Sequence, residues 1–313
     1  MSQAFPTLAT LRAGGKRAMA QALALIETAA GTQALATLLD AACADPKAQV
    51  AGLTGPPGVG KSTLTNALVR GWRAQGETVG VIAVDPSSRR TGGALLGDRA
   101  RISTDPEDRG VFVRSMAARD RLGGLSDQTV AAVALMRAVY DRVLVESVGI
   151  GQSEADISFA ADRVILCVQP GSGDSLQFMK AGVMELPDIV VVTKADMGDH
   201  ARRAKADVEG ALTLFDRDAD DWTAPVVLVS STQATGLDDL AGALAGHAAW
   251  LDQAGRRARR RAEQEQAWVD EALRTRFGTE GLTLAHRMMS SARGPFGREI
   301  ELGRELERRL HGA

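Results

Sequence analysis

Short apolar runs and longer amphipathic stretches alternate along most of the chain. The runs rich in Val, Ile and Leu are the strand candidates, at residues 48–55, 77–85, 110–115, 141–147, 162–169, 188–194 and 224–230. Their nearly continuous apolar character is typical of strands that are buried on both faces of a parallel sheet. Helical spacing of apolar residues predicts the intervening helices, at 61–75, 126–140, about 175–185, 199–214 and 236–250. This order of elements predicts an α/β domain at 47–250, with a mainly parallel central sheet flanked by helices.

The residues before this domain follow a purely helical pattern. Within residues 1–46, apolar positions recur at helical spacing from Leu8 to Ile26 and again from Leu35 to Leu39. We therefore expect an N-terminal extension of two short amphipathic helices that are joined near Gly31.

The residues after the domain, 251–313, combine an arginine-rich start with apolar stripes. The first stripe is Trp268, Ala272, Leu273 and Phe277, and the second is Leu302, Leu306 and Leu310. A helix outside the sheet domain must cover such a stripe, either with the same chain or with a second copy. We expect a C-terminal helical arm that forms a homodimer.

Composition and charge exclude several classes of protein. The chain has 313 residues, 45% of them hydrophobic, and a formal net charge of −2, so nothing global favours a polyanion-binding protein. No apolar run approaches the roughly 18 residues of a membrane span. Residues 1–21 lack the pattern of a secretion signal, and Cys43 and Cys167 stand apart from each other. We expect a cytoplasmic protein with reduced thiols.

The arginine run at 256–261 has two interpretations. A basic run is a weak signal for nucleic-acid binding. It is more often a solvated helix face, and here Glu263 and Glu265 follow at pairing distance. We favour the solvated face and expect no nucleic-acid partner.

The strongest motif is Gly55–Ser62, which matches G-x-x-x-x-G-K-[ST] at every fixed position. It follows a strand candidate and begins a helix, the context that this phosphate-binding loop requires. Its glycines let backbone N–H groups converge on phosphates, and the helix N-terminus adds partial positive charge. In this motif Lys61 neutralises phosphate charge and the Ser62 hydroxyl binds Mg²⁺. The nucleotide-contacting residues are predicted to be Gly58, Val59, Gly60, Lys61, Ser62 and Thr63.

The segment Thr193–Asp196 favours guanine over adenine. GTPases usually carry Asn-Lys-x-Asp after the corresponding strand, and a buried Asp196 would accept hydrogen bonds from guanine donors that adenine lacks. The Lys194 stem would lie against the base, and Ser230 and Ser231 fall where GTPases place a second base-contacting loop. Thr193 replaces the usual Asn, so the guanine preference is expected to be weaker.

Acidic residues at strand ends are the candidate metal ligands. Asp85 and Glu146 each end a predicted strand, so both carboxylates should lie at the sheet edge beside the phosphate loop. Gly149 follows Glu146 closely and is placed to sense a γ-phosphate. Asp98 lies in a loop and is a third candidate.

Four long signatures then indicate a particular family. GPPGVGKSTL, VIAVDPSSRRTGGALLGDRARI, ESVGIGQSE and QPGSGDSLQFMKAGVMELPDIVVVTKAD, read in order, resemble the MeaB/ArgK group of P-loop GTPases. Its members are GTPases associated with methylmalonyl-CoA mutase and related enzymes. The resemblance extends from about residue 10 to about residue 310.

The resemblance implies slow GTP hydrolysis that a vitamin-B12-dependent acyl-CoA mutase accelerates. It also implies a role in loading or repair of adenosylcobalamin on that mutase, with the cobalamin bound to the partner. Asp85 and Asp98 would belong to the Mg²⁺ and switch I region, and residues 146–151 to switch II. Residues 171–180 would form a third switch.

Site residues follow from the motifs and the resemblance together. Gln177 and Lys180 would report the nucleotide state to the mutase. The residues expected to act in hydrolysis are Lys61, Asp98, Glu146 and Lys180, and those expected at Mg²⁺ are Ser62, Asp85, Asp98 and Glu146. Thr193 departs from the family pattern as well.

Two other functions stay open. A nickel-delivery GTPase shares this type of domain, but it needs clustered Cys and His ligands. Here His200, His247, His286 and His311 are scattered, and we interpret each as a surface or capping residue. An ATP-using P-loop kinase or ATPase is the second alternative.

Overall fold

The computed structural model describes residues 5–86, 102, 105, 107–118, 125–147, 157–171, 185–214 and 220–310. Of Asp85 and Pro86, the backbone alone is described.

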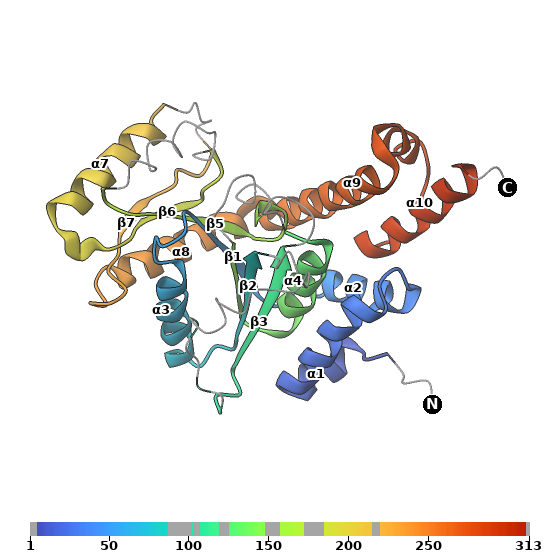
Figure 1. The fold of residues 1–313 in the computed structure, drawn as a ribbon, viewed down its shortest axis with the longest axis horizontal. Coiled ribbons are helices and arrows are strands. Elements are labelled where there is room, and N and C mark those ends of the chain that lie inside the picture. The colour runs from blue at the N-terminus through green and yellow to red at the C-terminus, as the bar shows by residue number, and fades with distance from the viewer. Residues whose placement is uncertain are drawn as a thin grey trace.

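A sheet of seven parallel strands forms the centre of the protein (Figure 1). The strands are β1 Gln49–Thr54, β2 Val79–Pro86, β3 Val111–Ala118, β4 Arg142–Glu146, β5 Arg163–Val168, β6 Ile189–Val192 and β7 Val226–Leu228. Their order across the sheet is β3-β2-β4-β1-β5-β6-β7. Each strand overlaps one of the predicted runs, and the predicted parallel α/β architecture is confirmed. The chain crosses from β4 to β5 over β1, so the carboxyl end of β1 is the switch point where such sheets bind ligands.

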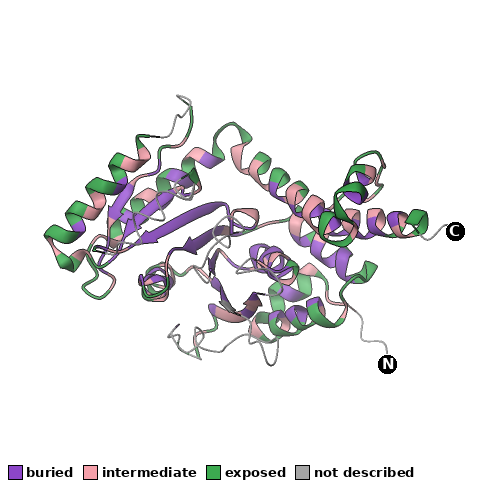
Figure 2. Ribbon diagram, turned by 45° about the horizontal axis from the view of Figure 1, so that its top comes forward, coloured by how far each residue is buried: buried purple, intermediate pink, exposed green. Residues whose placement is uncertain are grey.

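Helices cover both faces of the sheet because successive strand residues point to opposite sides. Leu53 of β1 packs with helices α3 and α8, whereas Val50 of the same strand packs with helix α4. A third cluster joins β5 and β6 to helix α7. The helices are α3 Lys61–Ala74, α4 Asp127–Val139, α7 Asp199–Leu212 and α8 Leu237–Asp252. All four were predicted; the helix expected at about 175–185 lies outside the described residues except for its last position. Most strand residues are buried and α3, α7 and α8 expose their outer sides, whereas in α4 only Asp127 is exposed (Figure 2).

The N-terminal and C-terminal segments lie side by side against α4 (Figure 1). The predicted N-terminal pair is confirmed as α1 Leu8–Thr28 and α2 Gln33–Ala44, with Gly31 between them at φ 73°. The C-terminal pair is α9 Arg256–Ala285 and α10 Pro295–Leu310. The carboxylate of Asp40 in α2 accepts hydrogen bonds from the N–H groups of Phe296 (2.9 Å) and Gly297 (3.0 Å), at the start of α10.

The apolar stripes of the arm face this chain's own core. Trp268, Leu273 and Leu306 are buried in one cluster with α1, α2 and α4, while Leu310 is exposed. A second copy is therefore not needed to cover most of the stripe, and dimerisation stays a prediction. The boundaries after residues 46 and 250 also stay predictions. Among the described residues, no helix combines the length and apolar character that crossing a bilayer requires.

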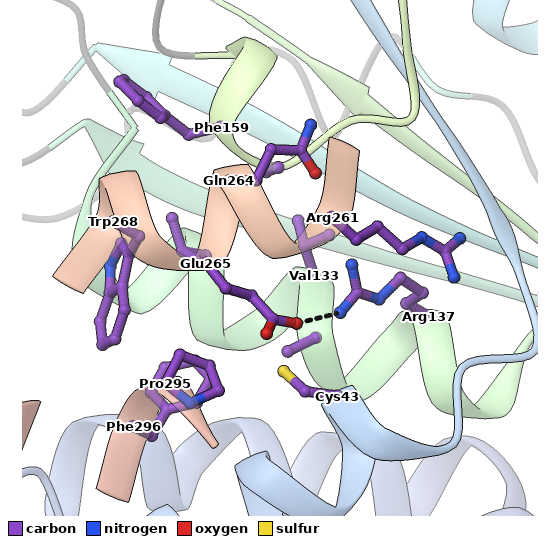
Figure 3. A pocket seen from close by; sticks show the side chains of 13 residues that line it. Cys43, Val133, Arg137, Phe159, Arg261, Gln264, Glu265, Trp268, Pro295 and Phe296 are labelled. Atoms are coloured by element: carbon purple, nitrogen blue, oxygen red, sulfur yellow. Dashed lines mark ion pairs between the residues drawn. The ribbon is translucent and has the colours of Figure 1, made fainter. Parts of the chain in front are cut away.

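A small cavity of about 30 Å³ lies where α2, α4, α9 and α10 meet (Figure 3). The rings of Trp268 and Phe296 pack there with centroids 4.5 Å apart. Arg137 of α4 and Glu265 of α9 form an ion pair at 3.7 Å. The sequence predicted that Glu265 pairs with the arginine run that precedes it. In the structure Glu265 pairs instead with Arg137 of α4.

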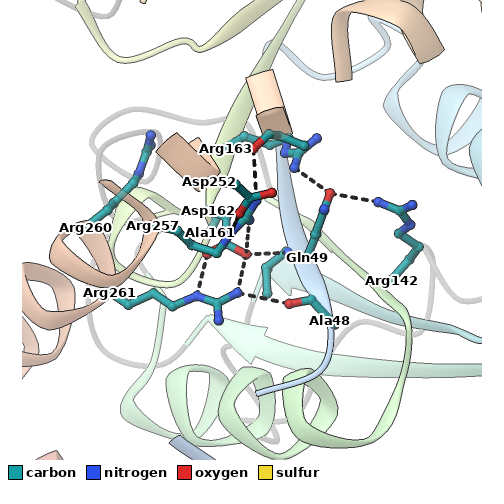
Figure 4. A network of polar contacts seen from close by, with 12 residues as sticks. Ala48, Gln49, Arg142, Ala161, Asp162, Arg163, Asp252, Arg257, Arg260 and Arg261 are labelled. Atoms are coloured by element: carbon teal, nitrogen blue, oxygen red, sulfur yellow. Dashed lines mark hydrogen bonds and ion pairs between the residues drawn. The ribbon is translucent and has the colours of Figure 1, made fainter. Parts of the chain in front are cut away.

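The arginine run begins α9 and clamps the amino edge of the sheet (Figure 4). Arg261 donates to both carboxylate oxygens of Asp162, each at 2.7 Å, and to the Ala48 carbonyl at 3.0 Å. Asp162 directly precedes β5, is 2% exposed, and also accepts from the Val50 N–H of β1 (2.8 Å). The prediction that the arginine run forms a solvated face is therefore wrong for Arg261. Local spacing could not reveal the contact, because Asp162 lies 99 positions away.

A second carboxylate at the same edge is held in the same way. Asp188, which directly precedes β6, receives two hydrogen bonds of 2.9 Å from Arg260. His247 of α8 places Nε2 3.2 Å from Asp188 Oδ1. Burial raises the pKa of Asp188, but His247 and Arg260 outweigh it and hold the pKa at about 2. His247 is fully buried, packed against Trp222 and Trp250, so its interpretation as a surface or capping residue is wrong.

We predict that Arg261→Ala lowers the free energy of unfolding by about 3–5 kcal/mol, because it leaves the buried Asp162 charge without its main partner. Burial raises the pKa of Asp162, but the Arg261 contacts outweigh it and keep that pKa below its usual value. The contribution of the pair is therefore complete above the ordinary aspartate pKa of about 4 and is lost as pH falls through the lowered value. Urea unfolding at neutral and acidic pH measures both effects.

The matched control is Arg259→Ala, in the same run but exposed. Its cost should stay within about 0.5 kcal/mol. An equal cost for the two substitutions would contradict the clamp.

Candidate functional site

The phosphate-binding loop joins β1 to α3 at the carboxyl edge of the sheet. The φ values of Gly55, Gly58 and Gly60 are 136°, 75° and 105°, which residues other than glycine rarely adopt. At Gly55 a Cβ would also lie only 2.2 Å from the Cys167 carbonyl oxygen of β5. The glycines predicted from the motif are thus required by backbone geometry, and the loop passes against the neighbouring strand.

Lys61, the first residue of α3, turns its side chain back over the loop. Its Nζ donates to the carbonyl oxygens of Gly55 (2.8 Å) and Pro56 (3.2 Å), and the residue is 7% exposed. N–H groups in the first turn of α3 have no acceptor within the helix and carry partial positive charge. A buried ammonium group beside a helix N-terminus fits the phosphates of a nucleotide.

Glu146 joins α3 to the end of β4. It is 2% exposed and accepts hydrogen bonds from the Ser62 hydroxyl (2.7 Å) and the Thr65 hydroxyl (3.0 Å). The predicted neighbours Ser62 and Glu146 are therefore brought together. Thr65 was missed; its signal was a second hydroxyl three positions after Ser62, on the same side of the helix.

The oxygen ligands at this point suit a hard divalent cation such as Mg²⁺. Ser62 and Glu146 would hold it, directly or through water. Asp85 is the penultimate residue of β2, two residues beyond Ala83, whose register partner is Glu146, so its backbone lies at the same edge. The side chain of Asp85 and all of Asp98 lie outside what is described. Within the described residues, no three His, Cys, Asp or Glu side chains gather as a metal cluster.

Thr193 attaches the base-recognition segment to the phosphate loop. Its buried hydroxyl lies 2.7 Å from the Val59 carbonyl oxygen and 3.1 Å from that of Val168, and is shared between them. Lys194 has φ 54°, and its Nζ reaches the Gly58 carbonyl oxygen (3.3 Å) and the Gln169 side chain. Thr193 thus connects three segments of the site, although it lacks the amide of the usual Asn. Gln169, which lies beside Lys194, was not predicted.

Asp196 and Ser230 also lie together. The Ser230 hydroxyl donates to Asp196 Oδ1 at 2.6 Å, and Ser231 is half-buried next to it. Ser230 is 1% exposed, but Asp196 is exposed, so the expectation of a buried carboxylate is wrong. Discrimination between bases would then depend on the base itself excluding water from Asp196. The predicted Gln177 and Lys180 lie outside the described residues, as do residues 148–151 of the predicted switch II.

These features define the class of protein. A glycine loop follows the central strand β1, and the Ser62 hydroxyl meets the Glu146 carboxylate beside that loop. A Lys-x-Asp segment follows β6, which lies two strands from β1 in the sheet. Together with the parallel sheet, they are the parts of a P-loop GTPase.

Comparison with known proteins gives the family. The chain belongs to the family described as methylmalonyl-CoA mutase-associated GTPase MeaB, whose model matches residues 19–281. It is 40% identical over 273 residues to a protein of Pyrococcus horikoshii assigned as a GTPase, covering 85% of this chain and 83% of that one. It is 36% identical over 290 residues to the GTPase ArgK of Escherichia coli, covering 88% and 87%.

A solved structure resembles the whole chain. The crystal structure of an LAO/AO transport system kinase aligns with a TM-score of 0.69 at 27% identity, covering 97% of this chain and 96% of that one. The fold, including the N-terminal and C-terminal helices, is therefore shared along nearly the full length.

We predict that Asp196→Ala weakens GTP binding by at least about 100-fold, since two hydrogen bonds to a charged group are lost at about 1.5–3 kcal/mol each. Binding of ATP should change little. Asp199→Ala, an exposed aspartate on the following helix, is the control and should leave both affinities unchanged. Titration with fluorescent guanine and adenine nucleotides measures this; an equal loss for both bases would contradict guanine recognition by Asp196.

We predict that Thr193→Val lowers the free energy of unfolding by about 1–3 kcal/mol, because two buried carbonyl oxygens lose their shared donor. Nucleotide affinity should fall as well, since Val59 belongs to the phosphate loop. Thr193→Ser keeps the hydroxyl and should retain most of the affinity. Urea unfolding and nucleotide titration of both variants decide; a Val variant with unchanged affinity would show that the hydroxyl does not position the loop.

Proposed function

We propose that this GTPase is Mg²⁺-dependent, hydrolyses GTP slowly, and is accelerated by an adenosylcobalamin-dependent acyl-CoA mutase whose cofactor loading or repair it gates. The family description supports the association with a mutase. The observation that carries the GTPase chemistry is the meeting of Ser62 with the buried carboxylate of Glu146, 2.7 Å apart, beside the phosphate loop.

Each residue of the site has a distinct task in this proposal. Backbone N–H groups of residues 58–63 hold the phosphates, and Lys61 neutralises charge between the β- and γ-phosphates. Ser62 and Glu146, with Asp85 and Asp98, hold the metal ion, which neutralises phosphate charge when bound. The catalytic set remains Lys61, Asp98, Glu146 and Lys180.

The sequence of residues 146–151 predicts slow GTP hydrolysis. The sequence ESVGIG has no Gln where small signalling GTPases orient the attacking water. A partner that orders this region would supply much of the rate. Residues 171–180 would transmit the nucleotide state to the mutase through Gln177 and Lys180.

We place the cobalamin on the mutase. In the described residues, His247 is occupied with Asp188 and buried, and burial raises the pKa of both the Cys43 and the Cys167 thiol to about 12. Cys167 is buried and Cys43 half-buried, and neutral thiols of this kind are poor metal ligands. The nickel-delivery alternative gains no support from these residues for the same reason. A cytoplasmic location stays a prediction.

We also propose homodimerisation through the C-terminal arm. Deleting the arm is a poor test because α9 and α10 cover the core of the same chain. Met289 and Leu310 are exposed apolar side chains of the arm, at 97% and 63%. Their replacement by Ser in the intact chain should reduce the dimer mass in sedimentation; a monomeric parent protein would refute the proposal directly.

We predict that phosphate release from GTP is slow alone and rises by more than about tenfold with the client mutase, since partner-supplied groups give about 10³–10⁵ in other GTPases. Lys180→Ala should reduce the mutase-stimulated rate by a larger factor than it reduces the unstimulated rate. Lys205→Ala on α7 is the control and should keep the stimulation. Equal turnover of ATP would favour a general P-loop NTPase, and stimulation by no mutase would refute the proposed partner.

A further inference from the structure

The segment that follows the predicted switch II is packed against the sheet. Residues 157–162 follow the predicted switch II (146–151) in the chain and lead into β5. They include the short 3-10 helix η1, Ile157–Phe159. Ile157 is fully buried against β1, where a Cβ on Gly52 would lie 2.6 Å from its Cγ1. This end of the segment therefore has a fixed position beside the strand that carries the phosphate loop.

Side chains of α9 hold the same residues by hydrogen bonds. Gln264 is 9% exposed, and its Nε2 donates to the carbonyl oxygens of Ser158 (2.6 Å) and Ala161 (2.8 Å). Figure 3 shows Gln264 on α9, close to Phe159 of η1 and one turn from Arg261. Arg261 adds its two bonds to the Asp162 carboxylate, so two side chains of α9 hold two backbone carbonyl oxygens and one carboxylate of this segment.

The other end of the predicted switch is attached to the nucleotide site. Ser147 donates from its N–H to the Leu53 carbonyl (2.9 Å), and its hydroxyl bonds the Thr54 hydroxyl (3.0 Å). Glu146 is bonded to Ser62. Residues 146–147 are thus bonded to β1 and to Ser62 at the end of the phosphate loop, whereas residues 157–162 are bonded to α9.

The helix that holds the far end also carries the arm. Trp268 follows Gln264 by one helical turn and packs against Phe296 of α10. A displacement of η1 therefore acts on a helix whose next turn contacts α10. Binding free energies coupled through such a contact act in both directions.

We propose that Gln264 is a positioning residue that couples the nucleotide state to the C-terminal arm by holding the exit of switch II. The proposal rests on the assignment of residues 146–151 as switch II in the proposed function. In this proposal nucleotide exchange displaces residues 157–162, and Gln264 transmits the displacement to α9. A protein bound to the arm changes the relative affinity for GTP and GDP by the same route.

The test compares Gln264→Met with Gln266→Met in the full-length protein without any mutase. Met keeps the length of the side chain but removes both donors. Gln266 is the matched control, because it is exposed on the same helix and bonds only neighbouring arm side chains, Asp270 and Arg298, among the described contacts. The readouts are single-turnover GTP hydrolysis, the ratio of GTP to GDP affinity, and urea unfolding.

Gln264→Met should change the affinity ratio and slow single-turnover hydrolysis by about 3- to 10-fold, the range expected for the net effect of these hydrogen bonds. Gln266→Met should change neither. A merely structural role would lower stability and leave the affinity ratio at the parent value, and that result would overturn the proposal.

Hydrogen exchange on the unmodified protein gives a second test that does not depend on a variant folding. Amides of α9 around residues 261–268 should exchange at different rates with GDP and with a non-hydrolysable GTP analogue. Identical exchange in the two states would overturn the coupling. Failure of the proposed function would give a different result: the parent protein would not hydrolyse GTP, or no mutase would stimulate its hydrolysis.

Discussion

The candidate site depends on the buried carboxylate of Glu146. It accepts hydrogen bonds from Ser62 and Thr65 and is 2% exposed, so α3 must stay where both hydroxyls reach it. A buried carboxylate without such donors would cost several kcal/mol. Because α3 begins at the phosphate loop, this contact also sets the direction from which the helix N-terminus faces a phosphate. This contact therefore positions the phosphate loop together with the residues that we propose hold Mg²⁺.

The two edges of the sheet have different tasks. The carboxyl edge presents the phosphate loop, Glu146 and the Thr193–Asp196 segment, as expected where connections diverge on either side of β1. The amino edge presents Asp162 and Asp188, and arginines of α9 compensate both charges. The C-terminal helix is consequently part of the stability of the GTPase domain, and its arm is not a detachable appendage.

Much of the fold and of the site was predictable because its signals are local. Apolar runs identified the strands, and the phosphate loop matched a motif whose glycines the backbone requires. The pairing of Ser62 with Glu146 followed from placing both at one sheet edge. In contrast, the arginine run, the buried His247 and the exposed Asp196 were misjudged, because burial depends on what packs over a residue and not on its neighbours in the sequence.

The sequence by itself determined the class of fold, the nucleotide loop and the resemblance to the MeaB/ArgK group, since strand periodicity and motif spacing act over a few residues. Only the tertiary structure decided what covers the apolar stripes of the arm and which carboxylates the arginines bind. It also decided that Thr193 bonds the phosphate loop and that Gln264 holds the segment before β5. The bonds from Thr193 to Val59 and from Gln264 to Ser158 and Ala161 join positions more than 100 residues apart, and no local pattern encodes which of many polar partners a folded chain brings together.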